Sequence, residues 1–396
     1  MKVNIRVVAL VCVVAALLGA GCGNRGTGPG SKEVHVAIIS ALTGPYAEPG
    51  IDMANGAEMA IADANAKGGV GGYTVVADKY DDAGNPGGAP SVASRIAGDT
   101  RIVGVIGHLN SGTTLAALEV YANAGLPLIM PVPTNPKITE RGFANVFRIP
   151  ITDNIQGQSL AKFARESLKA GDIAIIHDSD AWGEGIASVV KADAQRLGPK
   201  VVFFDSVSPQ QKDFRPIILK LKKLNPKAIF FAGGAVQSGL FFKQAAENQL
   251  KSSYLMGDSC FSPELISIAG AANLEGRAFV SYIAPPWTEN PSAKAFVDAY
   301  TTKYGSIKGF APLGYDAAQV LLESLRKADK SKPTGDVRKQ IIEFLHAPSF
   351  SLEGMIGRIH FNSNGDNAVE NTYFYQVVNG QFAVVKPKAK AATAAF

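Results

Sequence analysis

The stretch IVGVIGHLNSGTTLAALEVYANAGLPLIM, residues 102–130, decides the fold class. Residues 102–106 form a short apolar run, as expected of a parallel strand that is buried on both faces. Residues 113–123 carry apolar side chains at helical spacing, and a second apolar run follows at 126–130. A strand, a helix and a second strand in this order predict a right-handed βαβ unit, and therefore an α/β fold with a parallel sheet.

The same alternation continues toward both ends of the chain. On the N-terminal side we expect strands at 34–39 and 73–77, and helices at 51–66 and 89–97. The proline-rich segment 131–150 interrupts the pattern, which then restarts. The further strands are expected at 173–176, 201–204, 228–231 and 254–256, and the further helices at 155–168, 186–197, 214–224 and 238–248. The sequence thus predicts two successive α/β units that meet near 131–152.

The last hundred residues break with this order. After two prolines at 285–286 come three helical patterns, at 293–304, 315–327 and 337–345. The chain then turns β-like, with strands expected at 373–378 and 382–385 on either side of Asn379-Gly380, a dipeptide that favours a tight hairpin turn.

The net charge of +5 belongs to the two ends of the chain. Of the 396 residues, 39 are Lys or Arg and 34 are Asp or Glu. Two basic residues lie within 1–21 and three within 386–396, where acidic residues are missing, so residues 22–385 carry 34 basic and 34 acidic groups. A neutral body argues against nucleic acid as a partner. The segment 386–396 is expected to be a disordered basic tail.

The N-terminus has the pattern of an export signal. Two basic residues precede an unbroken apolar run of 14 residues at 7–20, which is shorter than the roughly 20 residues that span a bilayer. Small residues before Cys22 resemble a lipoprotein signal, so we expect 1–21 to be removed and Cys22 to carry lipid. Gly19 stands where leucine is usual, which leaves ordinary signal cleavage as the alternative. Residues 22–31 read as a flexible tether.

Sequence motifs of enzymes are missing. The chain has no Gly-x-Gly-x-x-Gly between a strand and a helix, no phosphate loop and no Gly-x-Ser-x-Gly elbow, and its five histidines lack metal-ligand spacing. Asp81-Asp82 fits a loop cap better than a metal or acid–base pair. Cys260 is expected to be a small buried residue. We therefore expect neither catalysis, nor a cofactor, nor a metal site.

Ligands of open parallel sheets bind beyond the carboxyl ends of the strands, near helix N-termini. Two loops of the first unit meet this description. In the loop after 102–106, Ser111 and Thr113 begin a helix, where they either hold a carboxylate or cap the helix. The loop 131–136 is rigid with proline, and is either a pocket wall or an exit between domains.

Two loops of the second unit also follow strands. In the first, Trp182 either covers an apolar ligand or packs against its own helix. In the second, Asp258 either pairs with an ammonium group or caps the next helix.

These loops belong to a set of stretches that occur in order along nearly all of the mature chain. They are Thr43-Gly44-Pro45, NAKGGV at 65–70, Lys79-Tyr80-Asp81-Asp82, Gly107-His108-Leu109, Arg141-Gly142-Phe143, His177-Asp178 with Gly183-Glu184-Gly185, and Lys212-Asp213-Phe214. With them the chain resembles the type I periplasmic solute-binding proteins of the branched-chain amino acid (leucine/isoleucine/valine-binding) ABC transporter family.

The resemblance implies two Rossmann-like lobes with parallel sheets, joined by a hinge of three crossovers and closing over a ligand. The first lobe would comprise 32–152 and 283–350. The second lobe would comprise 153–282 and 351–385.

The resemblance also implies roles for single residues. Ser111 matches the serine that holds the ligand's carboxylate and ammonium, Thr134 matches a threonine on the carboxylate, and Val132 matches a position whose backbone carbonyl faces the ammonium. Trp182 stands where the family often has tyrosine. Their neighbours in the same loops complete the expected ligand-binding set, which is Ser111, Gly112, Thr113, Val132, Pro133, Thr134, Trp182, Gly234, Asp258 and Ser259.

The departures concern the rest of the pocket. Ser259, beside Asp258, stands where the family has an acidic residue for the ammonium. Gly234 replaces a common tyrosine and Pro49 an aromatic residue, which suggests a reshaped pocket for a bulkier or non-standard acid. Gly84 and Asn110 replace a disulfide pair of some members.

We expect a monomeric, lipid-anchored binding protein in the periplasm or on the outer face of the cytoplasmic membrane. It would deliver a branched-chain or related amino acid, or a similar small carboxylate, to an ABC permease. The alternative is a ligand-sensing receptor of the same fold, for amides or aromatic acids.

Overall fold

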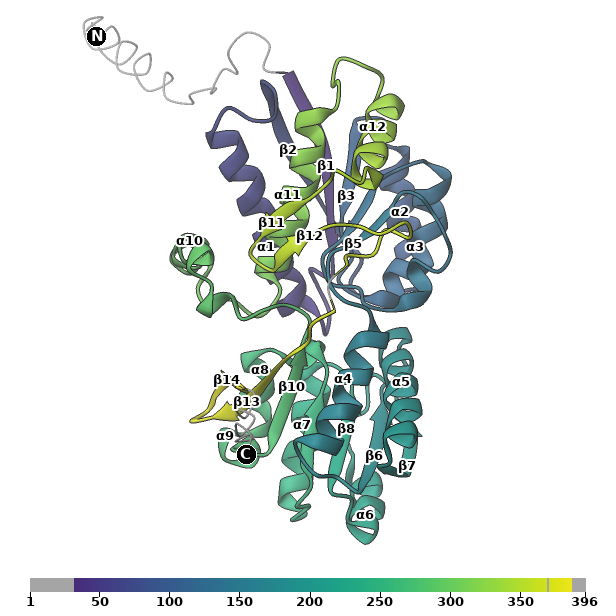
Figure 1. Ribbon diagram of the computed structural model, residues 1–396, viewed down its shortest axis with the longest axis vertical. Helices are drawn as coiled ribbons and strands as arrows, with labels where there is room; N and C mark the ends of the chain where they lie inside the picture. The colour runs from purple at the N-terminus through teal and green to yellow at the C-terminus, as the bar shows by residue number, and fades with distance from the viewer. Residues whose placement is uncertain (1–31, 369, 387–396) are drawn as a thin grey trace, which may run out of the picture.

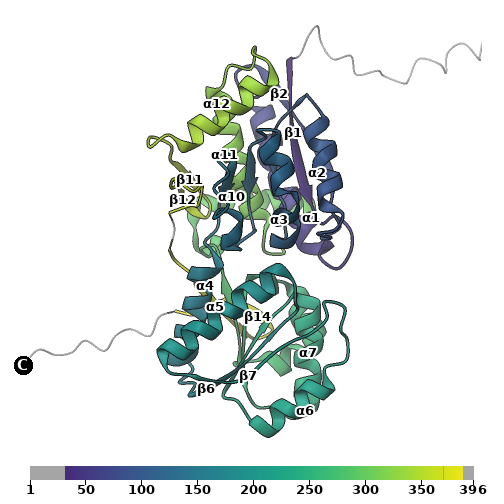
Figure 2. The ribbon, with the colours of Figure 1, turned by 90° about the vertical axis from the view of Figure 1, so that its right-hand side faces the viewer.

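The computed structural model describes residues 32–386 except residue 369. It consists of two lobes stacked along the long axis of the molecule (Figure 1). Each lobe is built on its own sheet, and helices cover both faces of each sheet (Figure 2). The expected signal peptide, the tether with Cys22 and all of the expected tail except Lys386 lie outside the described residues.

The first lobe contains a five-stranded sheet in the order β2-β1-β3-β4-β5, with every pair parallel. Its strands are β1 (Lys32–Ser40), β2 (Tyr73–Asp81), β3 (Ile102–Ile106), β4 (Leu128–Met130) and β5 (Val146–Arg148). The helices between them are α1 (Ala47–Ala66), α2 (Ala89–Gly98) and α3 (Ser111–Asn123). The predicted βαβ unit of residues 102–130 is thereby confirmed as β3-α3-β4.

The second lobe repeats this strand order as β7-β6-β8-β9-β10 and adds the antiparallel hairpin β13-β14 at the β10 edge. Its strands are β6 (Asp172–His177), β7 (Lys200–Ser206), β8 (Ala228–Ala232), β9 (Ser253–Met256), β10 (Ala278–Tyr282), β13 (Tyr373–Val378) and β14 (Gln381–Val384). Its helices are α4 (Asp153–Glu166), α5 (Ala181–Leu197), α6 (Arg215–Leu224), α7 (Ala235–Glu247), α8 (Pro263–Ala269) and α9 (Ala271–Leu274). The hairpin predicted around Asn379-Gly380 is confirmed.

Apolar cores lie on both faces of each sheet, which explains the continuous apolar runs of the strands. In the first lobe, α2 and α3 cover one face, while α1 and the late helices cover the other. In the second lobe, α4 and α5 pack on one face, and α6, α7 and α8 on the other. The late helices are α10 (Lys294–Tyr304), α11 (Ala311–Lys327) and α12 (Thr334–His346), and they return to the first lobe as expected.

The chain passes between the lobes three times. It leaves the first lobe after β5, returns after β10, and crosses again before β13. The three-crossover hinge that the resemblance implied is therefore present. It places the carboxyl ends of β1, β3 and β4 opposite those of β6, β8 and β9.

One predicted boundary is wrong. Residues 351–385 were expected in the second lobe, but β11 (Leu352–Gly354) and β12 (Gly357–Ile359) pack on the first. The carboxylate of Asp316 on α11 accepts hydrogen bonds from the backbone N–H groups of Met355 and Ile356, at 3.0 and 2.9 Å. Asp366 then forms an isolated parallel β-bridge with Arg148, the last residue of β5. The chain enters the second lobe only after this contact.

Within the described part of the chain, no helix is long and apolar enough to cross a membrane.

Candidate functional site

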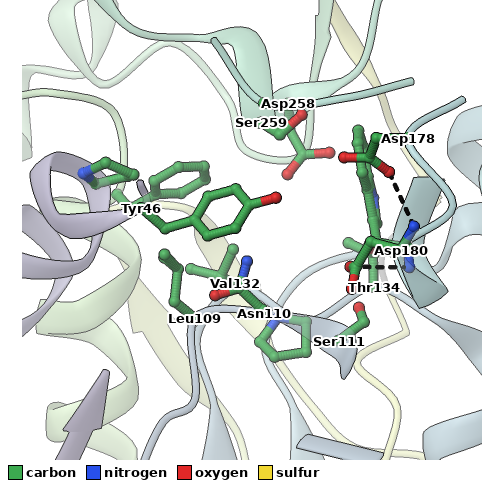
Figure 3. A pocket seen from close by; sticks show the side chains of 15 residues that line it. Tyr46, Leu109, Asn110, Ser111, Val132, Thr134, Asp178, Asp180, Asp258 and Ser259 are labelled. Carbon is green, nitrogen blue, oxygen red and sulfur yellow. Dashed lines mark hydrogen bonds between the residues drawn. The ribbon is translucent and has the colours of Figure 1, made fainter. Parts of the chain in front are cut away.

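A central cavity of about 50 Å³ lies between the two lobes (Figure 3). Its walls come from loops at the carboxyl ends of strands in both sheets, beside the points where the strand order reverses, which is where open α/β sheets bind ligands. The first lobe contributes Tyr46, Pro49, Leu109, Asn110, Ser111, Val132, Pro133, Thr134 and Phe310, and the second lobe contributes Asp178, Asp180, Trp182, Gly234, Asp258 and Ser259.

The N-terminus of α3 opens onto this cavity without a side-chain cap. Asn110 occupies the N-cap position but makes no capping hydrogen bond, and its buried Oδ1 has no partner in the part of the chain that the structure describes. The hydroxyl of Thr113 donates instead to the carbonyl of Asn110, at 2.9 Å. Ser111 is 2% exposed, and its Oγ accepts a bond from the backbone N–H of Asn135 at 3.3 Å. The positive end of this helix is therefore available to an anionic group.

The loop that carries Thr134 is fastened from behind by Arg148, the last residue of β5. The guanidinium donates to the carbonyls of Pro133 and Asn135, at 3.2 and 2.9 Å, and pairs with Asp366 at 2.7 Å. Arg148 is fully buried. Thr134 itself is buried and lines the cavity. The proline-rich loop is thus a rigid wall of the site as well as the exit toward the second lobe.

The wall formed by the second lobe carries three carboxylates. Asp258 is 3% exposed, its Oδ1 has no hydrogen-bond partner among the described residues, and Figure 3 shows its carboxylate directed into the cavity. Burial raises the pKa of Asp258 to about 6 and that of Asp178 to about 7. Asp180 accepts a bond from the backbone N–H of Trp182 and caps α5.

These carboxylates lack a cationic partner within the described chain. The ion pairs found there do not include Asp178, Asp180 or Asp258, and the cavity is lined by no basic residue. One wall therefore offers uncompensated negative charge, while the opposite wall offers a helix N-terminus and hydroxyls. This polarity suits a ligand with a cation at one end and an anion at the other.

A further buried acid, Asp153, begins α4 behind the cavity. Asp153 does not line the cavity, and neither of its side-chain oxygens has a hydrogen-bond partner among the described residues. Burial raises the pKa of Asp153 to about 7, although the side chain of Thr134 lowers it.

Apolar rings fill much of the remaining wall. Trp182 is 9% exposed and lines the cavity, and it also packs against Gly257, where an added Cβ would lie 2.7 Å from its ring. Trp182 therefore lines the cavity and packs against the loop after β9, and its contact with an apolar ligand stays a prediction. Tyr46, Leu109 and Phe310 add further apolar surface.

The lobes touch each other around the cavity. The side-chain amide of Asn135 donates to the carbonyl of Ala181 on α5, at 2.8 Å. The hydroxyl of Ser262 donates to the carboxylate of Glu48 on α1, also at 2.8 Å. These contacts join the two lobes on either side of the cleft.

Most of the predicted site residues meet at this cavity. Its lining includes Ser111, Val132, Pro133, Thr134, Trp182, Gly234, Asp258 and Ser259. Gly112 and Thr113 do not line it, because Gly112 faces Asp180 across the cleft and the Thr113 hydroxyl donates to the carbonyl of Asn110. The predicted ligand-binding set did not include six further lining residues besides Pro49, which are Tyr46, Leu109, Asn110, Asp178, Asp180 and Phe310.

The other candidates have structural roles. Asp81 accepts bonds from the backbone of Leu42 and Ala83, as expected of a loop cap, and Asp82 pairs with the buried His108. Cys260 is buried as predicted. Within the described ranges, no cluster of three or more His, Cys, Asp or Glu residues is arranged to hold a metal ion.

Comparison with known proteins agrees with this architecture. A family model described as periplasmic binding protein matches residues 33–381. The Leu/Ile/Val-binding protein of Citrobacter freundii is 34% identical over 340 residues, which cover 85% of this chain and 88% of that protein. The leucine-, isoleucine-, valine-, threonine- and alanine-binding protein of Pseudomonas aeruginosa is 33% identical over 334 residues, covering 84% of this chain and 87% of that protein.

Solved structures show the same fold. The leucine binding protein LivK of Thermotoga maritima superposes with a TM-score of 0.80 at 26% identity, over 89% of this chain and 98% of that one. The isoleucine complex of LivJ from Streptococcus pneumoniae gives 0.81 at 24% identity, over 90% and 100%. The fold is therefore that of the type I periplasmic binding proteins, and the relatives named are binding proteins rather than enzymes. The chain belongs to the periplasmic binding protein family.

Proposed function

We propose that this protein is the extracytoplasmic substrate-binding component of an ABC importer and that it binds an α-amino acid between its closing lobes. The observation that carries the proposal is the opposite chemistry of the two cavity walls. A helix N-terminus with hydroxyl groups faces an unpaired, buried carboxylate, and a zwitterionic amino acid complements both.

In this proposal the ligand's carboxylate binds the first lobe. The backbone N–H groups at the start of α3 and the hydroxyls of Ser111 and Thr134 supply its hydrogen bonds. The helix dipole adds a favourable field, worth about 0.3–1 kcal/mol and more where the geometry is partly buried. Arg148 holds the Thr134 loop in place without reaching the ligand.

The ligand's ammonium binds the second lobe. Asp258 is the acid whose free oxygen faces the cavity, and Val132 offers a backbone carbonyl nearby, as the resemblance implies. Ser259, at the position of the family's acid, donates its hydroxyl to the carbonyl of Gly233 at 2.9 Å. We therefore assign the ammonium to Asp258 rather than Ser259.

Three lines support transport and the extracytoplasmic location: family membership, the apolar run at 7–20, and relatives that bind branched-chain amino acids. The proposal includes a monomer held to the membrane by lipid on Cys22 and docking on a permease. It includes neither nucleic acid nor a cofactor.

Isothermal calorimetry of the protein from residue 32 onward, against the twenty amino acids at neutral pH, tests the proposal. We expect at least one aliphatic amino acid to bind, with raised thermal stability of the complex. A folded protein that binds none of the twenty would refute it.

A further inference from the structure

A second and larger cavity adjoins the central cavity. Its volume is about 460 Å³, and exposed residues such as Asn85, Pro86 and Gln210 line its far side, so we call it the outer cavity. Six residues line both spaces and together form the wall between them. They are Tyr46, Pro49, Asp180, Gly234, Ser259 and Phe310.

The ring of Tyr46 stands in this wall because two glycines leave room for it. A Cβ on Gly84 of the first lobe would lie 2.8 Å from Cδ2 of Tyr46, and a Cβ on Gly234 of the second lobe would lie 3.2 Å from its Cε1. Both distances are shorter than ordinary van der Waals contact. A larger residue at either position would push the ring out of its place.

The contacts that position the ring of Tyr46 lie mainly in the first lobe. Gly84 and Tyr46 are both in that lobe, so the ring keeps this neighbour when the lobes move relative to each other. Gly84 would also approach Asn110, with a Cβ 3.3 Å from its Oδ1. Glycine at position 84, where the resemblance implies a cysteine in some family members, is thus what lets the tyrosine ring lie here.

The hydroxyl of Tyr46 is directed into the central cavity. Figure 3 shows it pointing toward the side where Asp258 lies. Burial raises the pKa of Tyr46, and the charges of Asp178 and Asp180 act in the same direction, so the phenol stays protonated. It forms no hydrogen bond with the rest of the described chain, which leaves it free to donate to a ligand.

The volumes of the two cavities indicate how the wall limits the ligand's side chain. At about 50 Å³, the central cavity is smaller than the roughly 150 Å³ that accommodates benzene, so any amino acid requires the lobes to separate slightly. The outer cavity has ample room, but it is reached through the wall in which Tyr46 stands. A long side chain therefore meets the wall that contains this ring.

We propose that Tyr46 sets the upper size limit of the ligand's side chain, so that the protein selects amino acids with compact side chains, such as alanine or valine, over long or aromatic ones. This inference rests on the proposed function. It reverses the expectation of a bulkier ligand drawn from Pro49 and Gly234, because Tyr46 fills the room that an aromatic residue at position 234 would occupy.

The test is calorimetry of alanine, valine, leucine and phenylalanine with the wild type, Tyr46→Ala and Tyr46→Phe. Wild-type affinity should fall about tenfold or more from valine to phenylalanine, since pocket methylenes discriminate on this scale. Tyr46→Ala joins the two cavities and should bind phenylalanine about tenfold more tightly than the wild type. Tyr46→Phe retains the ring and should keep the wild-type order.

Two further variants serve as controls. Tyr80→Ala makes the same truncation at a tyrosine of the first lobe that lines neither cavity, and should leave the order unchanged. Tyr46→Leu is a milder truncation, to be used if thermal melting shows that Tyr46→Ala is misfolded.

Two outcomes would overturn the inference: wild-type protein that binds phenylalanine as tightly as valine, or a folded truncation variant with the wild-type order. A folded wild type that binds no amino acid would instead refute the proposed function.

Discussion

Replacing Arg148 with methionine tests how the wall of the ligand cavity is held. The guanidinium is fully buried, pairs with Asp366 at 2.7 Å, and donates to the carbonyls of Pro133 and Asn135 on either side of Thr134. Methionine replaces the aliphatic part of the arginine side chain and lacks its guanidinium. The variant removes the donor to Oδ1 of Asp366 and to both carbonyls, while the Thr139 hydroxyl still donates to Oδ2 of Asp366.

The expected cost follows from this burial. Removing one partner of a buried ion pair costs about 3–5 kcal/mol. The Asp366 side chain is 19% exposed and can regain some hydration, so we expect the lower end, about 3 kcal/mol. Urea denaturation followed by circular dichroism measures the loss. Amino acid affinity of the folded variant should fall as well, because the Thr134 loop is no longer fixed.

Arg101→Met is the matched control, because Arg101 pairs with Asp99 at 2.6 Å but its side chain is 61% exposed. Exposed ion pairs contribute little to stability, so this variant should be nearly as stable as the wild type. Adding Asp366→Leu to Arg148→Met should restore part of the lost stability, because it removes the unpaired charge. Equal, small losses for both arginine variants would refute the reasoning.

Two other predictions concern the ligand. Ser111→Ala should weaken amino acid binding by about 1–3 kcal/mol in calorimetry, through lost hydrogen bonds to a charged group, and an unchanged affinity would reduce Ser111 to a structural residue. Amino acid affinity should also fall as the pH drops through about 6, because a protonated Asp258 no longer attracts an ammonium. The free energy of unfolding of the empty protein should change with pH in the opposite direction. Burial raises the pKa of Asp178 from 3.8 to about 7 and that of Asp258 from 3.8 to about 6. The contribution of these two carboxyl groups to stability is therefore full below about pH 4 and is lost as the pH rises to about 7. Affinity independent of pH between about 5 and 8 would contradict the role of Asp258.

The regular part of the fold was predictable because parallel strands buried on both faces leave continuous apolar runs in the sequence. The unit at 102–130 shows this directly. Strand β5 (Val146–Arg148) is only three residues long and follows a proline-rich loop, so no run marks it. The segment 351–367 was misplaced because its attachment depends on backbone bonds to Asp316 and on the ion pair with Arg148, which are contacts between distant parts of the chain.

The site was predictable where loops follow strands. Ser111, Thr134, Trp182 and Asp258 all lie just after predicted strands and all line the cavity. Phe310 comes from a segment that returns from the other lobe, and no local sequence pattern indicates that it lines the cavity. Tyr46 did carry a signal, because it is an aromatic residue soon after the first strand, at the point where the strand order reverses.

The central claim is that the ligand lies with its carboxylate on the first lobe and its ammonium at Asp258. The most direct test measures the affinity of Asp258→Asn for valine and for isovaleric acid, which is the same ligand without the amino group. We expect valine binding to weaken by about 10- to 150-fold, the equivalent of one charge-assisted hydrogen bond, while the weaker binding of isovaleric acid stays unchanged. Equal losses for both ligands, or no loss for valine, would contradict it.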